Sequence, residues 1–313
     1  MEDVVDPDLL ICDPHHHLWD HPGDRYMVPE LMEDMTSGHR VASTVFVECD
    51  SGYRSDGPHV LRPVGETDFV VAADPAGLIA GVIGFADLRE PGVEDVLAAH
   101  VEAGRGRFRG IRSRSASDPG VEVPPSHTHP PAGLLGEAAF GAGVAALGRA
   151  GLSFDAWLYH PQIPELTALA RAHPETLMVL DHLGGPLGIG RYRRRRDDVL
   201  AEWRSSMTEL ASCANVVVKL GGVGMPMYGM KWHHDPGSTT SEEIAENWGR
   251  HIRWCIEAFG VSRCMFESNF PVDRLSCSYR VLWNAFKLIA AEATATEKAA
   301  LFHDTAVAVY RLG

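Results

Sequence analysis

The sequence lacks the features of a membrane-spanning or secreted protein. No uninterrupted apolar run reaches the roughly 18 residues that a membrane helix needs. The N-terminus, Met1-Glu2-Asp3, opens with acidic residues where a secretory signal would carry a basic and then an apolar segment. The six cysteines form no CxxC pair. These absences predict a cytoplasmic protein with reduced thiols.

Positive charge is also scarce. The 313 residues include 28 Lys and Arg against 42 Asp and Glu, which gives a net charge of −14. Such a chain has no long-range attraction to nucleic acid or to anionic membranes, so small molecules are the expected partners. The sequence is also compatible with a homo-oligomer. With 45% hydrophobic residues the chain can bury a large core, and we expect one domain over residues 1–313.

A GxGxxG turn is missing after the first predicted strand, which argues against an open doubly wound sheet. Short apolar runs rich in β-branched residues alternate instead with segments of helical periodicity. The predicted strands cover residues 10–17, 42–49, 81–88, 108–113, 153–160, 177–182, 216–220 and 264–269. Predicted helices include residues 93–103, 164–172, 198–212, 242–259 and 279–291. Eight βα pairs predict an α/β fold, a (β/α)₈ TIM barrel, with its site at the C-terminal strand ends. We expect irregular segments near 115–131 and 221–240 to overhang that site.

Histidines mark several of these strand ends. In the first predicted strand, alternation places Asp13, His15 and His17 on one face, where two imidazoles can bind one cation. His160 and His182 each end a later apolar run. Imidazoles at several strand ends predict a single site.

Four motifs together resemble the amidohydrolase-2 family of the amidohydrolase superfamily: HHHLWD, WLYHPQ, LDHLGGP and FESNFPVD. The resemblance covers nearly the whole chain. It implies a distorted TIM barrel and similarity to lactonases acting on sugar lactones and on carboxylated pyrone or muconolactone rings. By position, the family's HxH, its two later histidines and its acid on the eighth strand become His15, His17, His160, His182 and Asn269.

The resemblance also implies one divalent metal ion, with zinc as the first candidate. Three protein ligands and one water suit a catalytic zinc, and His15, His17 and His182 are the first choice. His160 would complete the shell or orient the substrate. The fourth predicted strand, FRGIRS, offers no Lys to be carboxylated and no Glu to bridge two metals, so a binuclear centre is not expected. The alternative is a metal-free site whose histidines are satisfied by hydrogen bonds.

Asn269 departs from the family pattern, because an amide cannot take a proton from water as a carboxylate does. It can still donate to a carbonyl. The base would then come from Glu48, Glu267 or Asp273. For Glu48 and Glu267 the alternative is a structural pairing with arginine, and for Asp273 a solvated or capping role.

Four residues are candidates for binding substrate. Arg112, at a strand end, offers a planar fork to a carboxylate, and the alternative is an ion pair with Glu48 or Glu267. The others are Arg109, Tyr159 and His234.

These residues predict a hydrolase that opens a lactone, or a related cyclic or activated ester, by attack of water. The substrate would be small and would carry a carboxylate if Arg112 binds it. One alternative is a lyase, such as a decarboxylase or hydratase, on the same scaffold. The other is a non-catalytic small-molecule binder, which the loss of the acid at Asn269 motivates.

Overall fold

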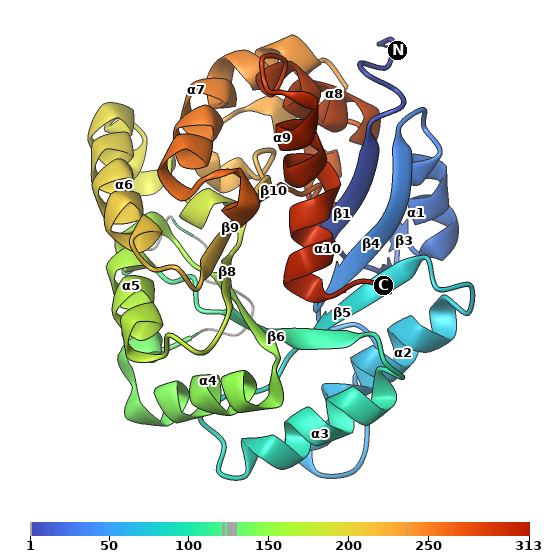
Figure 1. The fold of residues 1–313 in the computed structure, drawn as a ribbon, viewed down its shortest axis with the longest axis vertical. Coiled ribbons are helices and arrows are strands. Elements are labelled where there is room, and N and C mark those ends of the chain that lie inside the picture. Colours follow the sequence, from blue (N-terminus) through green and yellow to red (C-terminus); the bar gives the residue numbers. More distant parts are fainter. Residues whose placement is uncertain (1, 121–122, 124–129, 236) are drawn as a thin grey trace.

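A barrel of parallel strands forms the centre of the protein (Figure 1). The computed structural model describes residues 2–120, 123, 130–235 and 237–313. Eight strands pair in sequence order: β1 (Leu10–His16), β4 (Arg40–Val47), β5 (Ile79–Gly84), β6 (Phe108–Arg114), β7 (Ser153–Trp157), β8 (Met178–Leu180), β9 (Val216–Leu220) and β10 (Cys264–Phe266). Each predicted strand is present, and most end earlier than predicted because the chain turns where the polar residues begin.

The barrel closes between β1 and the segment that follows β10. His17 N donates to Phe270 O at 2.8 Å, and Asn269 N donates to His15 O at 2.9 Å. Asn269 has a left-handed φ of 56°, so the chain leaves the strand direction there. The predicted single-domain, distorted TIM barrel is therefore confirmed.

Helices surround the strands on the outside of the barrel (Figure 1). They are α1 (Val28–Met35), α2 (Val64–Ala73), α3 (Val93–Ala103), α4 (Ala138–Ala150), α5 (Ile163–Ala172), α6 (Arg196–Ala211), α7 (Ser241–Phe259), α8 (Tyr279–Ile289), α9 (Ala295–Ala299) and α10 (Thr305–Tyr310). In α7 the buried residues Ile244, Trp248, Ile252, Cys255 and Phe259 recur at helical spacing, which turns one face to the barrel. No helix of the described residues is both long and apolar enough to cross a membrane.

The inside of the barrel has two layers. An apolar layer, which includes Val179, Val217 and Met265, packs against Ala306 and Tyr310 of α10. Because side chains alternate along a strand, residues two positions further on also point inward, one layer nearer the C-terminal ends. Those positions are Asp181 directly after β8, Lys219 in β9 and Glu267 directly after β10, and all three are fully buried. The second layer of the barrel is therefore charged.

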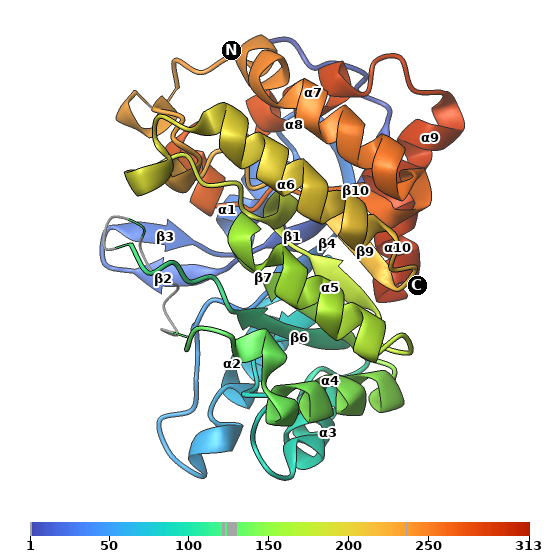
Figure 2. The same ribbon diagram turned by 90° about the vertical axis from the view of Figure 1, so that its left-hand side faces the viewer.

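Loops gather at the C-terminal ends of the strands. A hairpin of β2 (Trp19–His21) and β3 (Asp24–Tyr26) projects from the barrel on this side (Figure 2). The irregular segment at 221–240 follows β9 and contains short 3₁₀ turns at Pro226–Tyr228 and Trp232–His234. Of the segment predicted at 115–131, residues 121–122 and 124–129 lie outside the described part of the chain.

Candidate active site

A cavity of about 630 Å³ lies at these strand ends, within the size range of small-molecule sites. Its wall includes aromatic rings and thioethers: Trp19, Trp157, Tyr159, Met225 and Met227. Its polar lining includes His17, His182, Asn269, Asp50, Arg112 and Arg114. The cavity therefore combines flat apolar surfaces with a few polar groups, as a site for a small cyclic molecule would.

Two imidazoles present a lone pair to this cavity. His17 Nδ1 donates to the carbonyl oxygen of Val47 at 2.7 Å, and His182 Nδ1 donates to Glu267 Oε1 at 2.6 Å. A carbonyl or carboxylate oxygen only accepts, so Nδ1 of each ring carries a proton, and in the neutral form of such a ring the lone pair is on Nε2. Burial and the neighbouring Arg112 hold the pKa of His17 well below its usual range, which keeps this ring neutral.

His15 lies between cationic groups. Arg112 Nη1 donates to His15 Nε2 at 3.3 Å, so the ring proton is on Nδ1, which lies 2.8 Å from Glu267 Oε2. Lys219 Nζ is 3.2 Å from the same Nδ1. Burial and Lys219 hold the pKa of His15 well below its usual range. The ring is therefore neutral, and both of its nitrogens are engaged.

Glu267 lies behind the two histidines. Oε1 accepts from the backbone N and the Nδ1 of His182, and Oε2 contacts His15. Burial alone would raise the pKa of Glu267, but His182 and His15 lower it to about 2. Its carboxylate is fully buried, so it orients the rings instead of meeting a substrate.

Glu48 is likewise held by arginines. Arg112 Nε donates to Glu48 Oε1 at 2.8 Å, and another nitrogen of Arg112 donates to the Glu48 backbone carbonyl. Arg114 lies 2.9 Å from Glu48 Oε2 and 2.6 Å from Asp50. The structure therefore contains the ion pair that was the alternative for Arg112, while Arg112 also lines the cavity.

The third candidate acid, Asp273, supports Asn269. Asn269 Nδ2 donates to Asp273 Oδ1, and Gly224 N donates to Asp273 Oδ2, both at 2.8 Å. Burial raises the pKa of Asp273 to about 7. Its oxygens are occupied by these donors, so Asp273 fixes the amide of Asn269 at the cavity wall.

The charged layer includes residues that the sequence analysis missed: Asp155, Asp181 and Lys219. Lys219 Nζ lies 2.9 Å from Asp155 Oδ2 and 3.0 Å from Asp181 Oδ1. Tyr310 OH donates to Asp155 Oδ2 at 2.6 Å. One signal was available, because a lysine at an inward position of the apolar run VVVKL must have buried partners.

His160 does not join the other histidines, which corrects its predicted role. Trp157, the last residue of β7, and Tyr159 take the inward positions, and alternation turns His160 outward at the start of a 3₁₀ turn. Its Nδ1 accepts from Leu187 N at 3.3 Å, and its ring packs on Tyr192. The position of His160 in its motif predicted that it shares a site with the other histidines, but its side chain points away from the cavity.

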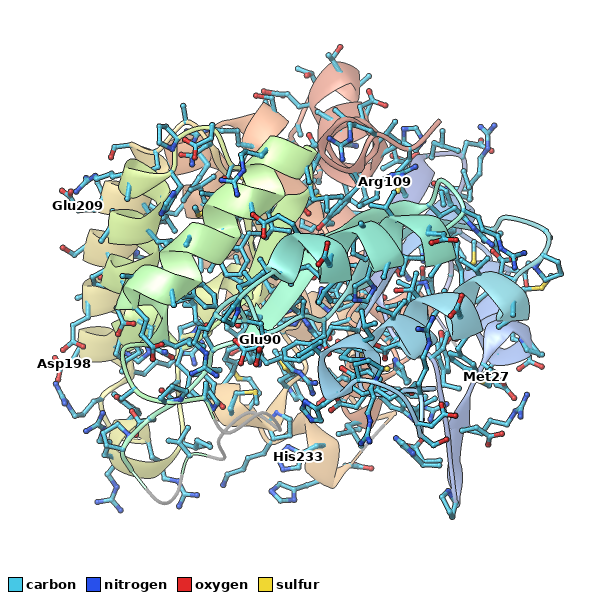
Figure 3. The ribbon with its side chains drawn as sticks, turned by 90° about the horizontal axis from the view of Figure 1, so that it is seen from below. Met27, Glu90, Arg109, Asp198, Glu209 and His233 are labelled. Carbon is cyan, nitrogen blue, oxygen red and sulfur yellow. The ribbon has the colours of Figure 1, made fainter. Side chains whose placement is uncertain are left out.

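Three further residues lie elsewhere than the sequence predicted. Arg109 lies near the start of β6, where it donates to Gly106 O, and Figure 3 shows it on the opposite side of the molecule from His233. His234 is exposed and its ring lies tilted against that of His233, outside the cavity lining. Asp13 does not share a face with His15, because β1 shifts register after Asp13; its carboxylate accepts from Tyr279 OH instead.

His15, Asp181 and His182 could together hold a metal ion. Each offers one ligand atom, these atoms lie within 4.8 Å of one another, and all three residues are buried. Asp181 thus joins the group in place of the predicted His17. Both Asp181 oxygens are buried and accept no hydrogen bond of regular geometry from the described residues, so they are suited to a cation.

Comparison with known proteins identifies the family. The amidohydrolase family model matches residues 12–312, so the chain belongs to this family. The uncharacterized protein y4mH of Sinorhizobium fredii is 34% identical, over 97% of this chain and 99% of that protein. An L-fucono-1,5-lactonase of Burkholderia multivorans is 29% identical, over 97% of this chain and 96% of the lactonase.

Solved structures agree with this assignment. A crystal structure of an amidohydrolase from Burkholderia multivorans with bound zinc has 26% identity and a TM-score of 0.76, covering 97% of this chain and all of that chain. That structure and the His15, Asp181 and His182 group suggest a divalent metal. A 5-carboxyvanillate decarboxylase from Sphingomonas paucimobilis, 13% identical with a TM-score of 0.58 over 97% of this chain and all of that one, shares the fold.

Proposed function

We propose that this member of the amidohydrolase family hydrolyses a small lactone, with His182 as the general base. One observation carries the proposal: His182 lines the cavity while its Nδ1 donates to the buried Glu267 carboxylate at 2.6 Å. A carboxylate behind an imidazole fixes the tautomer and stabilises the imidazolium that forms when the other nitrogen takes a proton.

The reaction follows from this arrangement. His182 Nε2 removes a proton from water as the water oxygen bonds to the lactone carbonyl carbon. Negative charge develops on the carbonyl oxygen, and the Arg112 guanidinium at the cavity wall is suited to stabilise it. The ring C–O bond then breaks, and the imidazolium returns its proton to the leaving alkoxide. The product is a hydroxy acid.

The donor set also fits a divalent ion, with zinc as our first candidate. His15, Asp181 and His182 would hold it, and it would polarise the carbonyl or activate water there. His182 would then be a ligand and not a base. Turnover measured after removal of metal distinguishes a base from a ligand, because only a base would keep its role without the ion.

The charges around the cavity favour an uncharged lactone ring over a polycarboxylate. Arg112 and Arg114, which would attract a substrate carboxylate, are already paired with Glu48 and Asp50. Trp157 and Tyr159 offer ring faces and edges to a cyclic substrate. The lactonase relative supports sugar lactones as the first substrates to test.

The test is to incubate the protein with a panel of sugar 1,5-lactones and a pyrone dicarboxylate. Proton release measures the rate of hydrolysis, and NMR identifies the products. We expect a hydroxy acid from an uncharged lactone, with His182→Gln lowering turnover by about 10²-fold or more. His160→Gln is the matched control, because His160 is a buried histidine outside the cavity lining. Release of carbon dioxide would identify a decarboxylase, and binding without turnover would identify a binding protein; either result contradicts the proposal.

A further inference from the structure

Lys219 places a positive charge inside the barrel, directly beneath the cavity. The residue is fully buried on β9. Its Nζ lies 2.9 Å from Asp155 Oδ2 and 3.0 Å from Asp181 Oδ1, so two buried carboxylates surround the amine. These two ion pairs hold Lys219 as an ammonium ion.

The ammonium contacts two of the three residues that could hold a metal. Lys219 Nζ lies 3.0 Å from Asp181 Oδ1 and 3.2 Å from His15 Nδ1. Arg112 approaches the same two residues from another side, at 3.3 Å from His15 Nε2 and 3.9 Å from Asp181 Oδ2. The atoms that a divalent ion needs are thus already in contact with cations of the chain itself.

We propose that Lys219 is a built-in cation that competes with a divalent metal for Asp181 and repels it from the neighbouring His15, so that the protein holds the metal weakly and exchangeably. The inference rests on the metal site proposed above and is independent of the lactonase reaction.

The position of Lys219 is fixed by its other partners. Asp155 Oδ2 lies 2.9 Å from Nζ and also accepts from Tyr310 OH, so the ammonium is anchored on the side away from the metal group. Moving Lys219 aside would leave a buried charge without a partner, which is strongly unfavourable. A metal bound to the same carboxylate and imidazole would therefore lie beside a second positive charge in a medium of low dielectric constant.

Calorimetric titration of zinc into chelator-treated protein tests the proposal. Lys219→Met removes the charge and nearly preserves the volume, so we expect the zinc Kd to fall by about tenfold or more. Zinc should also raise the Tm of the variant more than that of the wild type. Lys287→Met is the matched control, because Lys287 is a buried lysine that contacts His39 and Asp6, away from this cluster, and should leave zinc affinity unchanged.

Asp155 provides a second variant in case Lys219→Met does not fold. The double variant K219M/D155N removes one positive and one negative charge together, and zinc should again bind more tightly than in the wild type. Adding Asp181→Asn to either variant should abolish the gain. A zinc affinity equal to or below that of the wild type in both variants would overturn the proposal. Loss of the proposed lactonase reaction would leave this zinc result unchanged, so the two hypotheses can fail separately.

Discussion

Replacing Glu267 with glutamine changes a group that holds both His182 and His15 in their tautomers. Glu267 Oε1 accepts from His182 Nδ1 and Oε2 lies 2.8 Å from His15 Nδ1, whereas a glutamine side chain has one acceptor oxygen and one donor nitrogen. One ring must then face a donor and rotate or change its tautomer. We expect Glu267→Gln to lower turnover by about 10²-fold or more.

The same substitution should reduce stability by an amount that depends on pH. The pKa of Glu267 falls from its ordinary value of 4.5 to about 2 in the folded protein, because His182 and His15 outweigh the effect of burial. At about 1.4 kcal/mol per pKa unit, the carboxylate contributes on the order of 3 kcal/mol to folding at neutral pH. Because the folded pKa is the lower one, this contribution is present above about pH 4.5 and is lost as the pH falls towards 2.

Urea unfolding of the wild type and of Glu267→Gln between pH 7 and pH 3 measures this difference. The two curves should converge below about pH 4.5. Glu66→Gln is the control, because the pKa of Glu66 is shifted in the opposite direction: burial and Glu48 raise it to about 8. At neutral pH the folded protein therefore holds Glu66 in its uncharged form, which resembles glutamine. A stability difference for Glu267→Gln that stays constant from pH 7 to pH 3 would refute the reasoning.

Three further predictions concern the cavity wall. Arg112→Lys should reduce turnover equally for acidic and neutral lactones, because its guanidinium is paired with Glu48; a KM effect confined to acidic substrates in steady-state kinetics would contradict this pairing. Asn269→Asp should lose more stability than Asn269→Ala as the pH rises from 5 to 8 in thermal unfolding, since only the Asp variant adds a second carboxylate beside Asp273, whose own pKa of about 7 gives both variants some loss. Chelated enzyme should keep most of its turnover in the lactone assay, because His182 is then available as the base; loss that zinc restores would assign His182 to the metal.

The location of the site was predictable from the sequence, because parallel strands bring their polar ends to one edge. His15, His17 and His182, with Asn269 and Tyr159, were named from their positions after apolar runs, and the structure brings them to the cavity or directly beneath it. His160 was misplaced by the same reasoning, since one residue of offset after β7 reverses the direction of a side chain.

The roles of the acids could not be predicted, because they depend on contacts across the barrel. Glu48, Glu267 and Asp273 each looked suited to serve as a base, yet Glu48 contacts Arg112 from β6, Glu267 contacts histidines that follow β8 and lie on β1, and Asp273 contacts Gly224 after β9. These partners are far apart in the sequence. A local sequence pattern cannot predict contacts between residues that are so far apart in the chain.

The sequence by itself determined the barrel, since eight apolar runs alternating with helical segments have few other ways to bury their surfaces. It also determined that imidazoles gather at one end. Only the tertiary structure decided which nitrogen of each ring is free, and that Lys219 lies between Asp155, Asp181 and His15. The physical reason is that periodicity fixes which way a side chain points, whereas protonation and metal affinity depend on the charges that other strands place within a few ångströms.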